Sequence, residues 1–103
     1  MLKRSTMGKL KKNEIITELS KISGWEVIDE DSISKLSKEF HFENFVQALD
    51  FANKVGILAE EFNHHPRIIL EWGKVTTAWW SHSEGGIIQS DFDMAEKLDN
   101  IKT

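Results

Sequence analysis

The sequence predicts an α+β fold, a two-layer sandwich in which three helices cover one face of a four-stranded antiparallel sheet. Apolar residues switch along the chain between helical spacing and strand-like alternation, in the order α-β-β-α-β-β-α. The 103 residues, 40% of them hydrophobic, are enough for one core and leave no room for a second. Helices of so short a chain can cover only one face of such a sheet. We therefore expect a single domain over residues 1–103, with residues 1–8 as a flexible amino-terminal extension.

The first half of the chain begins with helical spacing of apolar residues over 9–22, and Gly24 is a natural carboxyl cap for that helix. Residues 25–28 are typical of a short strand, and the polar residues 29–32 of the turn that follows it. Residues 33–42 alternate, which indicates a half-buried strand. Its buried face is expected to carry Leu36, Phe40 and Phe42, and its exposed face Lys35, Ser37, Glu39 and His41.

Helical spacing returns over residues 43–62 and predicts a long helix, which ends ahead of Pro66 because residues before proline avoid the helical region. A β-rich segment follows at 67–72, and Gly73-Lys74 has the composition of a two-residue hairpin turn with glycine in its first central position. The long helix is expected to cover the sheet with Phe45, Val46, Leu49, Ala52, Val55, Ala59 and Phe62. The closing elements are a returning strand at 75–82 and an amphipathic helix at 91–101, with Phe92, Ala95, Leu98 and Ile101 inward.

The composition argues against several classes of function. There are no cysteines, which rules out a disulfide framework, a thiolate zinc site and a cysteine nucleophile. The formal net charge is −4, so nucleic-acid binding has little electrostatic support. Positive charges gather within residues 3–12, but no apolar run follows them, and no stretch approaches the length of a membrane span. We expect a cytoplasmic protein that binds neither nucleic acid nor membrane.

Three of the four histidines fall at junctions between predicted elements: His64 and His65 where the long helix ends, and His82 where the last strand ends. Adjacent histidines do not suit one metal ion, since helical ligand pairs prefer a spacing of four, so no metal site is expected. Glu60 lies one helical turn upstream, and Asp91 follows His82 in sequence. Histidine titrates near neutral pH and a carboxylate can fix its tautomer, so this set suits general acid–base chemistry.

The same residues also have a purely structural interpretation. Histidines at element ends are more often exposed or capping residues than catalysts. Tryptophans on a hairpin, here Trp72, Trp79 and Trp80, are usually core or interface residues. Trp80 alone shares a strand face with His82 by the period of two, and so has a geometric claim to line a pocket. Residue types and spacing by themselves leave both interpretations open.

A spaced set of residues completes the pattern: Glu60, His64-His65-Pro66, Trp72, His82 and Asp91. In identity and spacing this set resembles the signature of the pterin-4a-carbinolamine dehydratase family. The resemblance extends through residues 71–75 and 79–83, and Gly24-Trp25 and residues 40–42 are similar to the family's first strands. It covers the chain from about Gly24 to the carboxyl end, and residues 71–75 and 79–83 resemble the bacterial dehydratases that accompany phenylalanine hydroxylase. Arg67, Ile68 and Ile69 depart from more polar or aromatic residues in some relatives.

The resemblance implies a dehydratase that converts 4a-hydroxytetrahydrobiopterin to quinonoid dihydrobiopterin and water, with the pterin as substrate and no cofactor. His64 and His82 match the family's acid–base histidines, and His65 matches the one that binds and orients the pterin. Asp91 and Glu60 match supporting carboxylates. The implied substrate-binding set is Asn63, His64, His65, Pro66, Trp80, Ser81, His82 and Ser83. Family subunits associate through sheet edges and helices, which implies a homodimer or homotetramer, with a functional link to phenylalanine hydroxylase.

Two other functions stay open at this point. The family's fold also serves as a dimerisation partner for a transcription factor and as an assembly factor, so a non-catalytic interaction module is the main alternative. Loss of the histidines would favour it, yet His64, His65 and His82 are all present. A metal or small-ligand carrier built on these histidines is disfavoured by the absent cysteines and by the spacing.

Overall fold

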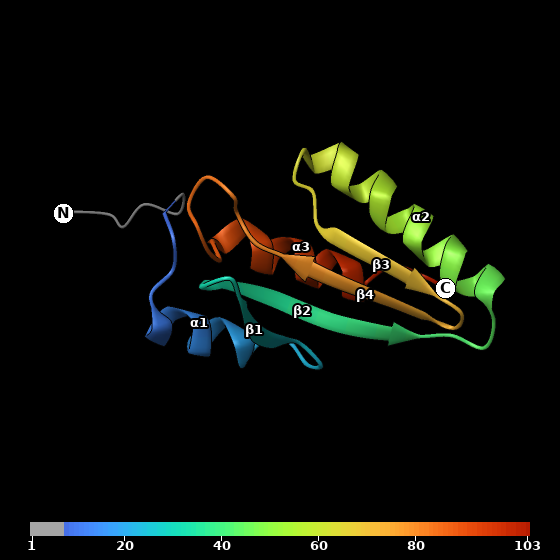
Figure 1. Ribbon diagram of the computed structural model, residues 1–103, viewed down its shortest axis with the longest axis horizontal. Helices are drawn as coiled ribbons and strands as arrows, with labels where there is room; N and C mark the ends of the chain where they lie inside the picture. The colour runs from blue at the N-terminus through green and yellow to red at the C-terminus, as the bar shows by residue number, and fades with distance from the viewer. Residues whose placement is uncertain (1–7) are drawn as a thin grey trace.

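The structure, a computed structural model, describes residues 8–103 and confirms the predicted α+β fold (Figure 1). The extension expected over residues 1–8 lies, except for Gly8, outside the described residues. No helix within residues 8–103 is long and apolar enough to cross a membrane. The elements follow the predicted order: α1 (Lys12–Leu19), β1 (Glu26–Glu30), β2 (Ile33–His41), α2 (Phe45–Phe62), β3 (Arg67–Glu71), β4 (Lys74–Trp79) and α3 (Gln89–Asp99).

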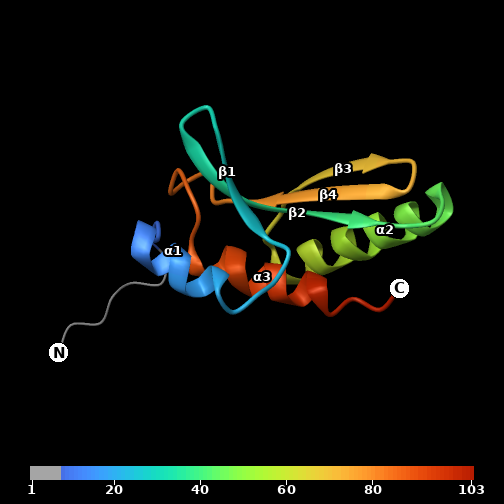
Figure 2. The same ribbon diagram turned by 90° about the horizontal axis from the view of Figure 1, so that it is seen from below.

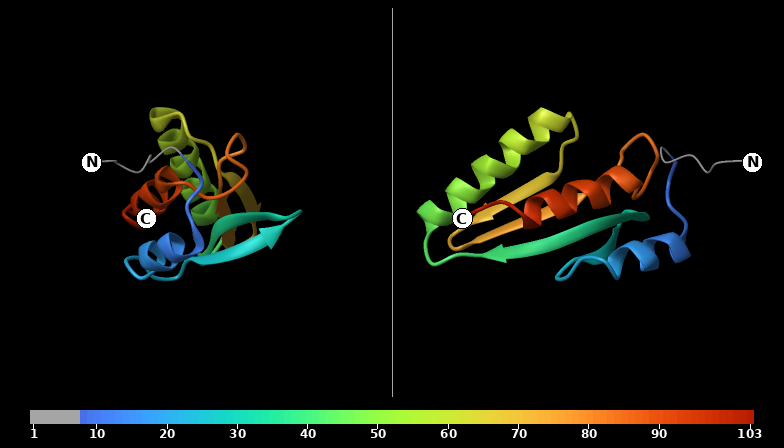
Figure 3. Two further views of the ribbon diagram at one scale, coloured as in Figure 1. Left: turned by 90° about the vertical axis from the view of Figure 1, so that its left-hand side faces the viewer. Right: turned by 180° about the vertical axis from the view of Figure 1, so that it is seen from behind.

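The four strands form one antiparallel sheet in the order β1-β2-β4-β3. Figures 2 and 3 show the three helices gathered on one face of this sheet. Leu36 on β2 lies opposite Trp79 on β4, and both side chains are fully buried. Since side chains alternate along a strand, Lys35 and Ala78 belong to the other face, which no helix of residues 8–103 covers. We call this the open face of the sheet.

The long helix α2 buries a different stripe from the expected one. Val55 and Ala59 are buried as predicted, but the exposed Phe45, Val46, Leu49 and Phe62 contradict the prediction. The buried face of α2 is instead made by Ala48, Phe51, Val55 and Ala59. Apolar residues occur on more than one side of this helix, so spacing alone admits both stripes. Packing decides, because the Phe51 ring lies 4.6 Å from that of Phe40 and 5.2 Å from that of Phe42.

The hairpin between β3 and β4 also differs from the prediction. Glu71 pairs with Lys74, so the two central residues of the turn are Trp72 and Gly73, not Gly73 and Lys74. Gly73 therefore takes the second central position, with φ of 69°, a left-handed conformation that glycine adopts without strain. A Cβ atom there would also lie 3.0 Å from the carbonyl oxygen of Phe42.

Three further differences bear on the candidate site. Strand β4 ends at Trp79, so His82 lies in the following loop and not at the end of a strand that reaches residue 82. Helix α3 begins at Gln89, which places Asp91 inside its first turn. Lys35 and Ser37, expected on an exposed strand face, are 6% and 5% exposed. Lys35 contacts Trp80 and Glu30, and the Ser37 hydroxyl donates to the Thr77 carbonyl, contacts that strand alternation does not include.

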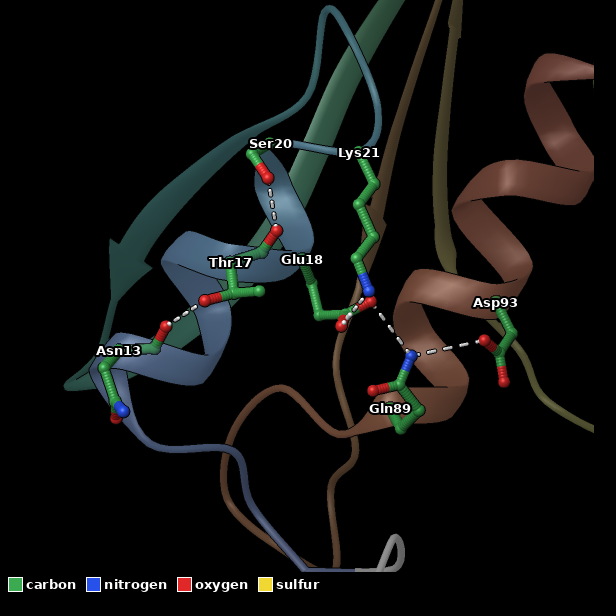
Figure 4. Close-up of polar contacts among 7 residues, drawn as sticks. All are labelled: Asn13, Thr17, Glu18, Ser20, Lys21, Gln89 and Asp93. Atoms are coloured by element: carbon green, nitrogen blue, oxygen red, sulfur yellow. Dashed lines mark hydrogen bonds and ion pairs between the residues drawn. The ribbon is translucent and has the colours of Figure 1, made fainter.

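The first helix is tied to the start of α3, as Figure 4 shows. The Gln89 side-chain amide donates to Glu18 of α1 and to Asp93, both at 3.3 Å. Just before α1, the backbone N–H of Leu10 donates to the carbonyl of Ile87 at 2.8 Å. These contacts fix the amino-terminal turn of α3, which carries Asp91.

Candidate active site

The carboxyl end of α2 delivers the first two histidines. Asn63 adopts a left-handed conformation, with φ of 51° and ψ of 44°, and ends the helix. Its backbone N–H donates to the carbonyl of Glu60 at 3.3 Å, and that of His64 donates to the carbonyl of Ala59 at 3.1 Å. This arrangement is a common helix ending that asparagine tolerates better than most residues. It turns the chain sharply, so that His64 points back toward α3.

His64 meets a buried carboxylate. Its Nε2 atom lies 2.6 Å from Oδ1 of Asp91, whose side chain is fully buried. The other carboxylate oxygen, Oδ2, accepts the backbone N–H of Ile88 at 2.8 Å. Burial raises the pKa of Asp91 above its usual value, and the hydrogen bonds with Ile88 and His64 act in the opposite direction. Within residues 8–103, Nδ1 of His64 makes no hydrogen bond, which leaves one ring nitrogen for a ligand.

The His64 ring stacks on Trp79, with ring centroids 5.3 Å apart and an angle of 22° between the planes. Trp79 is fully buried, so the imidazole is held between a rigid indole and the Asp91 carboxylate. His64 also lines a cavity of about 370 Å³, within the range of roughly 300–1,000 Å³ that is usual for small-molecule sites. The cavity lies between the end of α2 and α3, and its lining residues are Phe62, His64, Ser90, Asp93, Met94, Glu96 and Lys97.

His65 is held less firmly than His64. Its Nε2 atom lies 2.5 Å from Oε2 of Glu60, but the two side chains are 55% and 79% exposed. Exposed ion pairs of this kind stabilise a structure little, because water competes for both partners. The structure places this pair at the surface beside the end of α2.

His82 lies in the loop between β4 and α3. The ends of this loop are joined by the Ser81 and Gly86 backbones, with the Ser81 N–H donating to the Gly86 carbonyl at 2.8 Å. The His82 ring packs against Trp80, with centroids 4.8 Å apart, and is otherwise exposed. The hydroxyls of Ser81 and Ser83 lie 3.3 Å apart. Trp80 and His82 are thus in contact, although β4 ends before either residue and does not give them the shared strand face that the sequence predicts.

The two tryptophans place His64 and His82 on either side of one strand end. Trp79, the last residue of β4, contacts His64 on the helix side, and Trp80, the residue after β4, contacts Lys35 on the open face. His64 contacts the first and His82 the second, so both histidines flank the carboxyl end of β4. Within residues 8–103, no hydrogen bond, ion pair or ring contact joins His64 to His82. His82 is not among the residues that line the His64 cavity.

Some residues of this region were not found from the sequence. Trp79 was interpreted as a core or interface residue, but it also supports the His64 ring. The backbone N–H of Ile88 holds the second oxygen of Asp91. The spacing of three from Ile88 to Asp91 is typical of a carboxylate that caps a helix start, and could have indicated this bond. Of the expected substrate-binding residues, Asn63 and Pro66 shape the chain around His64 and His65.

The described residues contain no group of three or more His, Cys, Asp or Glu side chains that could hold a metal ion. The expectation of a metal-free site rests on histidine spacing and stays a prediction.

Comparisons with known proteins agree on one family. Residues 8–101 match the family described as pterin 4 alpha carbinolamine dehydratase. A protein of Nitrosococcus oceani, provisionally named as such a dehydratase, is 45% identical over 95% of this chain and 87% of its own length. A Photobacterium profundum protein of the same provisional name is 51% identical over 84% of this chain and 77% of its own.

Two solved structures are similar. One, described as a transcriptional coactivator/pterin dehydratase from Brucella melitensis, has a TM-score of 0.80 and 27% identity. The similarity covers 89% of this chain and 96% of that one. The other, a pterin dehydratase-like protein identified as a RuBisCO assembly factor, has a TM-score of 0.61 and 22% identity over 74% of this chain and 86% of its own. At that identity it supports the fold alone.

Proposed function

Because the chain belongs to the pterin-4-alpha-carbinolamine dehydratase family, we propose that it converts 4a-hydroxytetrahydrobiopterin to quinonoid dihydrobiopterin and water by histidine acid–base catalysis. One observation carries the catalytic part of this proposal. The His64 imidazole is fixed by a buried carboxylate and a buried indole, borders a cavity, and keeps one ring nitrogen free of protein partners among the described residues. Such a histidine is prepared to move a proton at a bound ligand.

The reaction needs two proton transfers. The carbon–oxygen bond at C4a breaks as an acid donates a proton to the leaving hydroxyl, which departs as water. A base removes the proton from the adjacent ring nitrogen, whose electrons form the new carbon–nitrogen double bond. One proton is given and one is taken, so the enzyme ends with its starting charge and no electrons are transferred.

We assign these two transfers to His64 and His82. They flank the end of β4 from its two sides, which supports opposite roles around one flat substrate. Which histidine is the acid and which the base depends on the face of the pterin that carries the hydroxyl. Asp91 keeps a proton on Nε2 of His64 and so leaves Nδ1 for the substrate. His65, with Glu60 beside it, binds and orients the pterin.

The proposed reaction balances without a metal ion or a redox cofactor, and we propose that none takes part. Protein dialysed against a chelator should keep its full turnover. Loss of turnover that a divalent ion restores would contradict this part of the proposal. The proposed cellular role is recycling of the pterin for aromatic amino acid hydroxylation in the cytoplasm, with phenylalanine hydroxylase as the functional partner.

The central experiment uses carbinolamine made chemically from a tetrahydropterin. Its spontaneous dehydration is followed by absorbance with and without the purified full-length chain. Acceleration that saturates with substrate supports the proposal. A rate equal to the uncatalysed one contradicts it and favours the alternative, a non-catalytic interaction module.

We also propose that the chain forms a homodimer or homotetramer. The exposed apolar side chains of α2, among them Val46 at 73% and Ile57 at 69%, support a contact between copies. The edge strand β3, with Ile69 partly exposed on it, supports a second one. Light scattering on purified protein tests the association, and a monomer at micromolar concentration would contradict it.

A further inference from the structure

A cluster of charged residues lies on the open face, outside the His64 cavity. Lys35 is 6% exposed although none of the described helices covers this face. Its ammonium group lies 4.1 Å from the centroid of the Trp80 ring and donates to Oε1 of Glu30 at 2.9 Å. A buried ammonium group needs such a partner, because burial removes its water. Trp80 and Glu30 therefore take the place of solvent around Lys35.

Glu30 connects the two edges of the sheet. It is the last residue of β1, and Arg67 is the first of β3, at the opposite edge. Both terminal guanidinium nitrogens of Arg67 donate to the Glu30 carboxylate, Nη1 to Oε1 at 2.8 Å and Nη2 to Oε2 at 3.3 Å. The β1–β2 hairpin brings Glu30 over the sheet toward Arg67, because its tip bends away from the helices on the open-face side (Figure 2). Asp31 and Ser32, both with positive φ, form the tight turn at this tip.

Trp80 lies under this bridge. The Arg67 guanidinium carbon is 5.7 Å from the Trp80 ring centroid, so both cations held by Glu30 also contact the indole. Cations over an indole ring are attracted by its negative face, Trp being the best partner for them. The hydrogen bond with Arg67, followed by that with Lys35, lowers the pKa of Glu30 to about 2, so the carboxylate stays charged at neutral pH. We call Glu30, Lys35 and Arg67 the clamp.

Trp80 connects the clamp to His82. Within residues 8–103, His82 makes no hydrogen bond or ion pair, and its one ring contact is with Trp80. His64 is oriented by the buried Asp91, but the part of the chain that the structure describes offers His82 no carboxylate of this kind. Whatever holds the indole of Trp80 in place also restricts the ring of His82.

We infer that the clamp is a positioning device for His82, in which Glu30 draws Lys35 and Arg67 onto Trp80 and the fixed indole orients the imidazole. This inference rests on the proposed function, since it gives His82 a part in the reaction. Without the Glu30 carboxylate the two cations repel each other, and Lys35 loses its counter-ion. The indole then moves more freely, and His82 samples orientations that do not reach the substrate.

The test compares Glu30→Ala with Glu26→Ala. Both glutamates lie on β1 and point to the same side of it, but the structure gives the Glu26 side chain no hydrogen bond or ion pair among residues 8–103. All variants carry Trp72→Phe, because Trp72 is 72% exposed and would dominate quenching of tryptophan fluorescence. Trp25 and Trp79 are buried, so Trp80 is then the most accessible indole. Acrylamide quenching and steady-state dehydration kinetics are measured on each full-length protein, with the His82 ring signal followed by NMR.

Glu30→Ala is expected to increase the quenching and to shift the His82 signal, while Glu26→Ala does neither. It should lower kcat by about 10- to 100-fold with KM little changed, since a small misplacement of a reacting group costs about 100-fold in rate. Arg67→Met removes the other end of the bridge and should act in the same direction.

Three results would overturn the inference: quenching in Glu30→Ala equal to that in Glu26→Ala, an unmoved His82 signal, or greater quenching with unchanged kcat. If the parent protein does not dehydrate the carbinolamine, the proposed function fails instead. Quenching and the NMR signal then still decide whether the clamp orders Trp80 and His82.

Discussion

His64 and Asp91, 27 residues apart in the chain, meet with 2.6 Å between Nε2 and Oδ1. The carboxylate is fully buried and its second oxygen is occupied by the Ile88 N–H, so it has a single orientation. A carboxylate that accepts from Nε2–H fixes the tautomer of the imidazole and leaves Nδ1 without its proton. The contact therefore sets which nitrogen of His64 faces a ligand.

Asp91→Asn tests this directly. An amide has a similar shape but offers an N–H group, which favours the other tautomer of His64. We expect kcat to fall by about 10²- to 10⁴-fold, as when an orienting carboxylate is replaced in other histidine enzymes. The dehydration assay measures this, with Asp50→Asn, an exposed carboxylate paired with Lys54 on α2, as the matched control. Equal rates in the two variants would remove Asp91 from the mechanism.

Alanine at His64 or at His82 should lower turnover by about 10²- to 10⁴-fold each, because each loses one acid or base. The variants should differ in stability. His82 is exposed and its replacement should leave the melting temperature unchanged, whereas His64→Ala loses its stacking on Trp79 and should melt earlier. His41→Ala is the control, since His41 is exposed on β2 and has no assigned role. Parent-like turnover in both active-site variants would contradict the assignment.

For His65→Ala we expect a raised KM with kcat little changed, because this exposed residue is proposed to bind the pterin and not to move its protons. Glu60→Gln should have a smaller effect on KM in the same direction, since the Glu60 side chain is 79% exposed and its pairing with His65 is weak. Steady-state kinetics at several pterin concentrations separate the two constants. A collapsed kcat with unchanged KM would give His65 a catalytic role instead.

Local sequence patterns were enough to predict the order of helices and strands in this protein. The alternation of β2 indicated the side that carries Leu36, and Pro66 marked the end of α2 and with it the position of His64. These features depend on neighbours within a few residues. The same reasoning failed for α2, where two apolar stripes compete and the choice depends on how Phe51 packs with Phe40 and Phe42.

Contacts between distant elements could not be predicted in the same way. The approach of Asp91 to His64 depends on where α3 begins, and the bridge from Glu30 to Arg67 spans 37 residues and needs the bend of a hairpin. Lys35 was expected in solvent for this reason, because nothing in the alternation of β2 indicates that Trp80 and Glu30 cover it. The family resemblance proposed the candidate residues, and only packing could give their orientation.

The stability of the protein should depend on pH through Asp91 and Glu30 with opposite signs. The pKa of Asp91 is raised in the folded state from 3.8, so its stabilising contribution is full below 3.8 and is lost as the pH rises through the folded pKa. The pKa of Glu30 is lowered from 4.5 to about 2, so its contribution is present above 4.5 and is lost as the pH falls toward 2.

Urea unfolding between pH 2 and neutrality measures both effects. Relative to Asp91→Asn, the parent protein should lose stability as the pH rises above about 4; relative to Glu30→Gln it should lose stability as the pH falls below that value. The slopes carry the test, because each substitution also changes a hydrogen bond. Slopes of the same sign would show that one of the two groups is not in the environment described.

Asn63 offers a test that separates a structural role from a binding role. It ends α2 with φ of 51°, where most residues are strained by about 1–2 kcal/mol and glycine is not. Asn63→Ala should therefore lower the free energy of unfolding by about 1 kcal/mol, and Asn63→Gly should leave it close to that of the parent protein. Since the turn directs His64 toward Asp91, the glycine variant should also keep its kcat. Equal stability of the two variants would contradict the conformational role. A loss of substrate affinity shared by both would instead indicate that the Asn63 side chain contacts the pterin.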